Sequence, residues 1–179
     1  MAEHADHALQ AAVKALTEVV APAVDPQGPL AVDQLRLVVS WLQFDATRRH
    51  QQRQLVQAEL ALRIALAEAV LPGLAATQPQ RAAALGQALR EARAVHGRPG
   101  AESAAWRAAA DGLDALVSDA VHAAAQGPAA ARKLLADQVL QHAHDSLMIR
   151  RAWFAPLGFE ARPDSVPAVE TLLRATTTP

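Results

Sequence analysis

One segment of the chain constrains its fold more than any other: residues Ala31 to Leu71 contain neither glycine nor proline. Within this segment apolar residues recur in steps of three and four, the spacing that places side chains on one face of an α-helix. We therefore predict one long, unbroken helix, roughly 60 Å long at the usual rise per residue. Two arginines, Arg49 and Arg53, fall in the middle of its apolar face.

The rest of the chain also predicts helices, separated by clusters of proline and glycine. The predicted segments are residues 6–21, 79–96, 101–125, 128–154 and a short helix after Ser165. The composition is 51% hydrophobic but only 3% aromatic, and runs of strand-forming residues are missing. The expected fold is all-α: a single-domain helical bundle of about six helices over residues 1–179, with residues 1–5 and 175–179 frayed.

Charge and cysteine content exclude several classes of function. The chain has 17 Lys+Arg and 18 Asp+Glu, so it carries no broad positive field that would favour the binding of nucleic acid. The absence of cysteine excludes disulfides and thiolate metal sites. No secretory signal is recognisable, and no stretch reaches the roughly 18 uncharged apolar residues of a membrane span. We expect a cytoplasmic protein that binds neither nucleic acid nor membrane and carries no cofactor.

The two arginines within the apolar face allow two interpretations. In one, this part of the helix is solvated, and Asp45 pairs with Arg49 four residues later, as on many helix surfaces. In the other, Arg49 and Arg53 face His142, Asp145 and Ser146 from the helix at 128–154. Such a cluster could bind a small anion, with arginines for a carboxylate or phosphate and His142 for proton exchange.

Catalytic and metal signatures are absent from the sequence. His142 and Asp145, three residues apart on a helix, could share an ion, but the Glu-x-x-His pairs of di-iron bundles are missing. No glycine-rich phosphate loop, nucleophile elbow or His-Glu-x-x-His motif is found. We therefore predict no metal site and assign no catalytic residue.

Two functions remain after these exclusions. The first is a non-enzymatic interaction or scaffold protein that forms a homodimer, or docks a protein partner, through Leu60, Ile64 and Leu71 of the long helix. The alternative is a binding protein or minor enzyme for a small anionic ligand, which would use the Arg49, Arg53, His142, Asp145 and Ser146 cluster.

Overall fold

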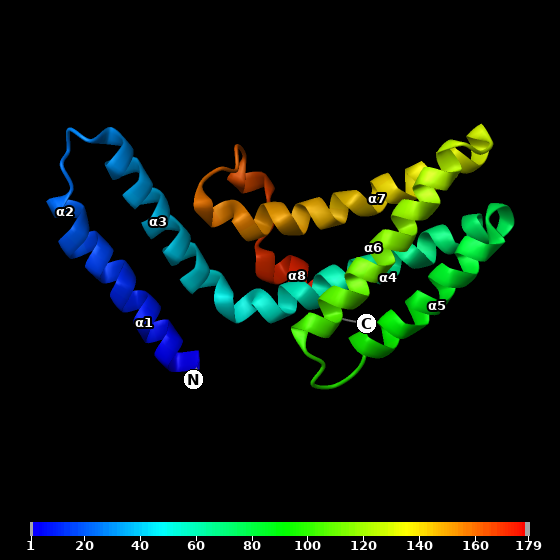
Figure 1. Cartoon of the computed structure of the whole chain (residues 1–179), viewed down its shortest axis with the longest axis horizontal. Helices are drawn as coiled ribbons and strands as arrows, with labels where there is room; N and C mark the ends of the chain where they lie inside the picture. Colours follow the sequence, from blue (N-terminus) through cyan, green and yellow to red (C-terminus); the bar gives the residue numbers. More distant parts are fainter. Residues whose placement is uncertain (1, 178–179) are drawn as a thin grey trace. The chain divides into compact units, whose positions relative to one another are not determined.

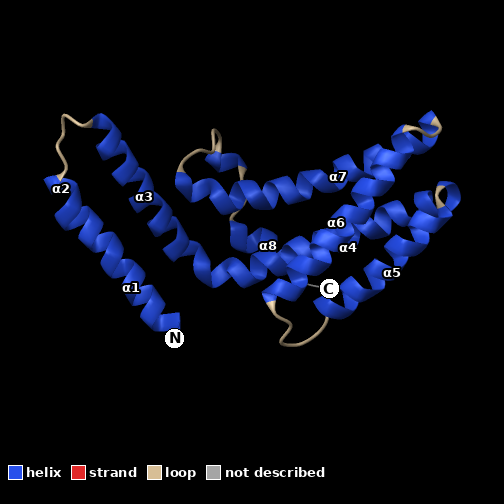
Figure 2. Cartoon of the chain, viewed as in Figure 1, coloured by secondary structure: helices blue, strands red, loops and turns tan. Residues whose placement is uncertain are grey.

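The computed structural model describes residues 2–177, and this part of the chain is almost entirely helical, with 87% helix and no strand (Figures 1 and 2). The described residues form six helical segments, one of them 49 residues long. The all-α class and the long second helix are therefore confirmed. Contacts divide the chain into a hairpin unit, Met1–Gln52 with Trp153–Pro163, and a bundle unit, Arg53–Ala152 with Asp164–Pro179. The boundaries of the predicted single domain stay a prediction.

The long helical segment consists of α3 (Pro29–Arg48), a 3-10 turn (Arg49–Gln51) and α4 (Gln52–Thr77). It continues through Pro72 and Gly73, where the sequence predicts a break. It ends at Thr77, and the next residue, Gln78, has an extended φ of −141°. A proline disfavours the α-helical region for the residue before it, and Gln78, which precedes Pro79, leaves that region.

In the hairpin unit, α1 (Ala2–Ala15), a π-helical turn (Leu16–Val20) and α2 (Ala21–Ala23) precede α3. The connection between α2 and α3 is a tight turn in which the Gly28 N–H donates to the Asp25 carbonyl at 3.0 Å. α1 packs against α3. The seam between them is made of aliphatic side chains that remain half-buried: Leu9, Val13, Leu16, Val32, Leu35, Val39 and Leu42. Two helices that pack only against each other leave the edges of their seam open to solvent, so these side chains are only partly covered.

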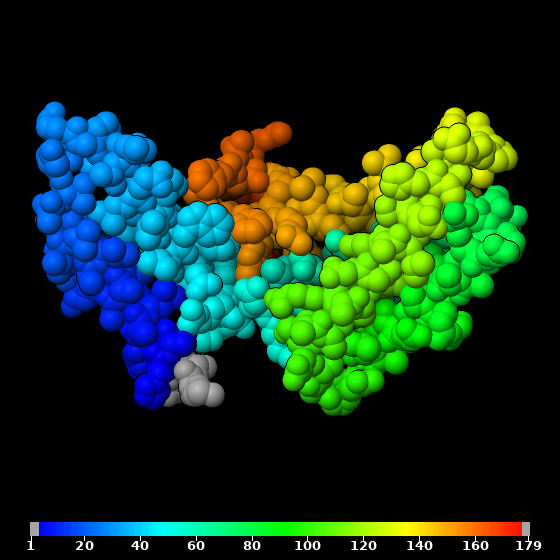
Figure 3. Space-filling model, viewed as in Figure 1, coloured from blue at the N-terminus to red at the C-terminus, as the bar shows by residue number. Residues whose placement is uncertain are grey.

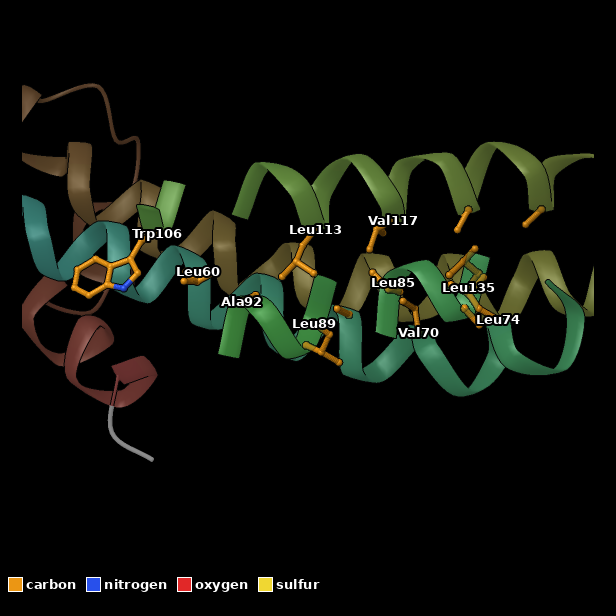
Figure 4. Close-up of a cluster of buried hydrophobic side chains, with 14 of the residues drawn as sticks. Leu60, Val70, Leu74, Leu85, Leu89, Ala92, Trp106, Leu113, Val117 and Leu135 are labelled. Carbon is orange, nitrogen blue, oxygen red and sulfur yellow. The ribbon is translucent and has the colours of Figure 1, made fainter. Parts of the chain in front are cut away.

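The bundle unit holds α4, α5 (Pro79–His96), α6 (Ser103–Ala125), most of α7 (Ala129–Phe154) and α8 (Val169–Thr177). Between α7 and α8 the chain forms two short 3-10 turns, Ala155–Leu157, which belongs to the hairpin unit, and Pro163–Ser165, where the chain re-enters the bundle unit. α5 and α6 pack closely against each other. The core is aliphatic, and Figure 4 shows its side chains directed between α4, α5 and α6: among them Leu60, Val70, Leu74, Leu85, Leu89, Leu113 and Val117.

α5 illustrates how an alanine-rich helix joins this core. Its apolar face is narrow in sequence and suggests a peripheral element, yet Ala82, Leu85, Leu89 and Ala92 are all buried. Small side chains let helix axes approach closely, so four residues on one face suffice to seat the helix against α6. The Trp106 indole N–H donates to the Val95 carbonyl at 3.2 Å and ties the two helices together at one end.

Candidate functional site

Arg49, the first predicted ligand-binding residue, lies in the hairpin unit and is neutralised by two carboxylates. Its guanidinium donates to Asp6 Oδ1 at 3.0 Å and to Asp45 Oδ2 at 2.8 Å. Hydrogen bonds to Asp45 and then to Asp6 raise the pKa of the Arg49 guanidinium. The predicted surface pair with Asp45 is therefore present, and Asp6 extends it by linking α1 to the end of the α3 helix.

Arg53, the second predicted residue, is the first residue of the bundle unit and makes structural contacts there. Its guanidinium donates to the Ala101 carbonyl at 2.8 Å and lies 4.4 Å from the centre of the Trp106 ring. A guanidinium over an indole face is an attractive cation–π geometry. Arg53 thus fastens the loop between α5 and α6 to the start of α4.

Replacing Arg53 with alanine is expected to lower the free energy of unfolding by about 1–2 kcal/mol, because the buried Ala101 carbonyl loses its donor and Trp106 loses the cation. Chemical denaturation measures this change. Arg107→Ala, at an exposed position of α6, is the matched control and should change stability by less than about 0.5 kcal/mol. Equal effects of the two substitutions would contradict a structural role for Arg53.

His142 and Ser146 line one small pocket of about 230 Å³ in the bundle unit. The arginine beside them is Arg63, which donates to Asp114 Oδ2 at 3.0 Å and to Ser146 Oγ at 3.0 Å. His142 Nδ1 lies 3.0 Å from the Gln138 carbonyl in the preceding turn of its own helix. Asp114 already neutralises Arg63, so the pocket has no cation that requires an external anion.

The five predicted ligand residues are therefore not gathered around one cavity. His142 and Ser146 share a pocket, whereas Asp145 lines a different one beside α8, and neither pocket is lined by Arg49 or Arg53. Their ligand-binding role stays a prediction. Sequence analysis missed Arg63, whose position next to Ile64 on the apolar face of α4 was the available signal.

The three predicted interface residues belong to the bundle core instead. Leu60 has 0% of its surface exposed, and Ile64 and Leu71 are partly buried against the same cluster. Leu60 is covered by its own chain and offers no surface to a partner in the folded bundle unit, and the interface role of the three residues stays a prediction. The physical reason is that α4 is packed within the bundle unit and does not project from it.

Several large apolar side chains are exposed on residues 19–41 of the hairpin unit, the segment that Figure 3 draws in blue to cyan. No described side chain from His4 to Gln43 is buried. Six large apolar residues within this range are more than one-third exposed: Val19, Val20, Leu30, Leu37, Val38 and Trp41. On α3 they lie outside the seam with α1, so this helix is apolar on more than one face, a pattern typical of helices with several neighbours.

The buried residues of the hairpin unit lie in an aromatic cluster at one end of α3. Phe44 stacks on Phe154 at 5.5 Å and meets Trp153 edge-on at 6.3 Å. Arg48, the only buried charged residue in the described part of the chain, donates from Nε to the Trp153 carbonyl at 3.1 Å. Trp41 contacts Phe44 edge-on at 5.5 Å and remains 49% exposed. Sequence analysis did not single out Arg48.

Among the described residues, no group of three histidine, aspartate or glutamate side chains is placed to hold a metal ion. One helix, Pro29–Thr77, is long and apolar enough to cross a membrane by length and composition alone. Core helices of other proteins meet the same criterion, and Leu60, Ala67 and Val70 of this helix lie in the bundle core.

Comparison with known proteins adds no relative: no family model, no curated protein and no solved structure matches this chain.

Proposed function

We propose that this chain is a non-enzymatic helical interaction protein that self-associates through its hairpin unit, with a second copy of the chain as the partner. One observation carries the proposal. Six large apolar side chains from Val19 to Trp41 are exposed, and no described side chain between His4 and Gln43 is buried.

The energetics of a two-helix hairpin favour this association. Helices gain most of their stability from burying an apolar face against neighbours, and one neighbour covers only one seam. Two hairpins packed face to face would form a four-helix arrangement, which covers each helix on two sides. In a two-fold dimer the same patch meets itself, and an apolar patch is complementary to its own copy.

Both cations between His4 and Gln43 have acidic neighbours along the chain. Lys14 pairs with Glu18 at 3.8 Å, and Arg36 pairs with Asp33 at 3.7 Å. These pairs compensate each other locally, so neither adds much repulsion between two copies. Trp41 supplies the large aromatic anchor that interaction surfaces often contain.

The anionic-ligand function predicted from the sequence receives less support. Arg49 hydrogen-bonds to two carboxylates, Arg53 to a carbonyl, and Arg63 to a carboxylate and a hydroxyl. An incoming anion would have to displace these partners. We therefore place the function on the apolar surface of the hairpin unit and not on the arginines.

Sedimentation equilibrium of the full chain tests self-association. We expect the average mass to rise with concentration from that of the 18.9 kDa chain towards twice this value, because apolar burial drives the equilibrium. Circular dichroism measured in parallel should show more helix at higher concentration if the hairpin is stabilised by its partner. A mass that stays at 18.9 kDa up to the solubility limit would contradict the proposal.

A further inference from the structure

A pocket of about 260 Å³ that is partly open to solvent lies on the bundle unit, between the last turns of α4, the end of α6 and the start of α7, and its lining residue Leu134 is 53% exposed. Its walls are mostly aliphatic, including Val70, Leu74, Leu134 and Leu135. No charged side chain lines it, and its polar lining consists of Thr77, Gln78 and Gln138. An engineered cavity of about 150 Å³ lined by apolar residues stays dry and binds benzene, so a somewhat larger aromatic molecule fits the volume of this pocket.

The wall formed by α4 contains the two residues least favourable in a helix interior, Pro72 and Gly73. Gly73 keeps the space open, because a Cβ atom at this position would lie 3.3 Å from Leu134 Cδ2. Any longer side chain at residue 73 would therefore crowd α7 or occupy the pocket. The pocket depends on a residue that the helix alone would not favour.

One buried polar atom near the pocket has no partner. Gln78 donates from Nε2 to the Ala120 carbonyl at 3.4 Å, while its Oε1 is buried and accepts no hydrogen bond from any described residue. Buried acceptors are nearly always satisfied in folded proteins. The terminal torsion of a glutamine side chain has a broad energy minimum, so the amide can rotate to turn Oε1 towards a donor in the pocket, and this rotation gives up the long 3.4 Å contact of Nε2 with the Ala120 carbonyl.

We propose that this pocket binds a small, uncharged, mainly hydrocarbon molecule with one hydroxyl group, of the size of an alkylphenol. The aliphatic walls hold the hydrocarbon part, and the hydroxyl donates to Gln78 Oε1. An ionised ligand is excluded because burying a charge without a partner is unfavourable. This site lies in the bundle unit and is independent of self-association through the hairpin unit.

Isothermal titration calorimetry of the full chain with three matched probes tests the proposal. The probes 4-ethylphenol, 4-ethyltoluene and 4-ethylbenzoate share one ring and differ in a single group. We expect 4-ethylphenol to bind about five-fold more tightly than 4-ethyltoluene, the fold-change of one net hydrogen bond, and 4-ethylbenzoate not to bind. In Gln78→Leu the preference for the phenol should disappear while both neutral probes still bind.

Two variants that fill the pocket from opposite walls complete the test. Gly73→Leu on α4 and Ala131→Met on α7 should each weaken 4-ethylphenol binding by about ten-fold or more, since the occupied space is no longer available. Gly112→Leu is the control for Gly73→Leu, because a Cβ atom at residue 112 meets nothing within 4 Å. If Gly73→Leu fails to fold, the binding of 4-ethylphenol to Ala131→Met alone decides whether the ligand occupies this space. Undetectable binding of both neutral probes to the wild type, equal binding of 4-ethylbenzoate, or unchanged binding to the filled variants would overturn the proposal.

Discussion

Replacing Leu37 with aspartate is expected to raise the dissociation constant of the self-associated protein by about thirty-fold or more, equivalent to about 2 kcal/mol. Leu37 is 43% exposed and lies on the same face of α3 as Leu30 and Trp41, which are seven positions before and four after it. A carboxylate in the centre of an apolar contact would be buried without a partner in both copies. Sedimentation equilibrium over a range of concentrations measures the change.

Leu140→Asp is the matched control for this substitution. Leu140 is 69% exposed on α7 and lies outside the hairpin unit, so the same change in charge and helix propensity occurs away from the proposed contact. We expect the dissociation constant of this control to stay within about two-fold of the wild type. An equal weakening by both variants would point to non-specific association, and no weakening by Leu37→Asp would place the contact elsewhere.

The helices of this chain were largely predictable because their boundaries depend on local chemistry. The segment at Pro79–His96 begins and ends as the sequence predicts, with proline in the first turn and glycine after the last. The error at Pro72 has an equally local cause. Proline marks a helix end only when the residue before it leaves the helical region, and Gln78 does so before Pro79, whereas Leu71 stays helical before Pro72.

The site was less predictable, because periodicity gives the face of a helix but not its neighbour. The apolar face of the long segment is continuous in sequence, yet it serves two units: Leu35 and Val39 lie in the half-buried hairpin seam, and Leu60 lies in the core. The sequence analysis placed the contact with a partner on the α4 half of the segment, whose apolar face the bundle unit covers. The available signal for the other half was the apolar residues of α3 outside that face, such as Leu37 and Trp41, which a helix with a single neighbour does not need.

Replacing Leu60 with alanine is expected to lower the free energy of unfolding by about 2–5 kcal/mol, because it leaves a cavity in a close-packed core. Leu60 is one of the four largest fully buried side chains in the described part of the chain, and it packs in the cluster that holds Leu113. Urea denaturation followed by circular dichroism at 222 nm measures the change, with the wavelength chosen for helix content. Because Leu60 lies outside the hairpin unit, the self-association constant of the folded variant should not change.

Leu147→Ala provides the comparison, since Leu147 is 56% exposed on α7 and the same atoms are removed from a solvated site. Its expected effect on unfolding is within about 0.5 kcal/mol. The pair separates the two roles that the sequence allowed for Leu60. Truncating a core residue lowers the free energy of unfolding and leaves the dissociation constant unchanged. Truncating a docking residue raises the dissociation constant and leaves the unfolding of the dilute monomer nearly unchanged. The second pattern would contradict the packing of α4 described above, because removing a side chain with 0% exposure cannot act on a partner without first disturbing its own core.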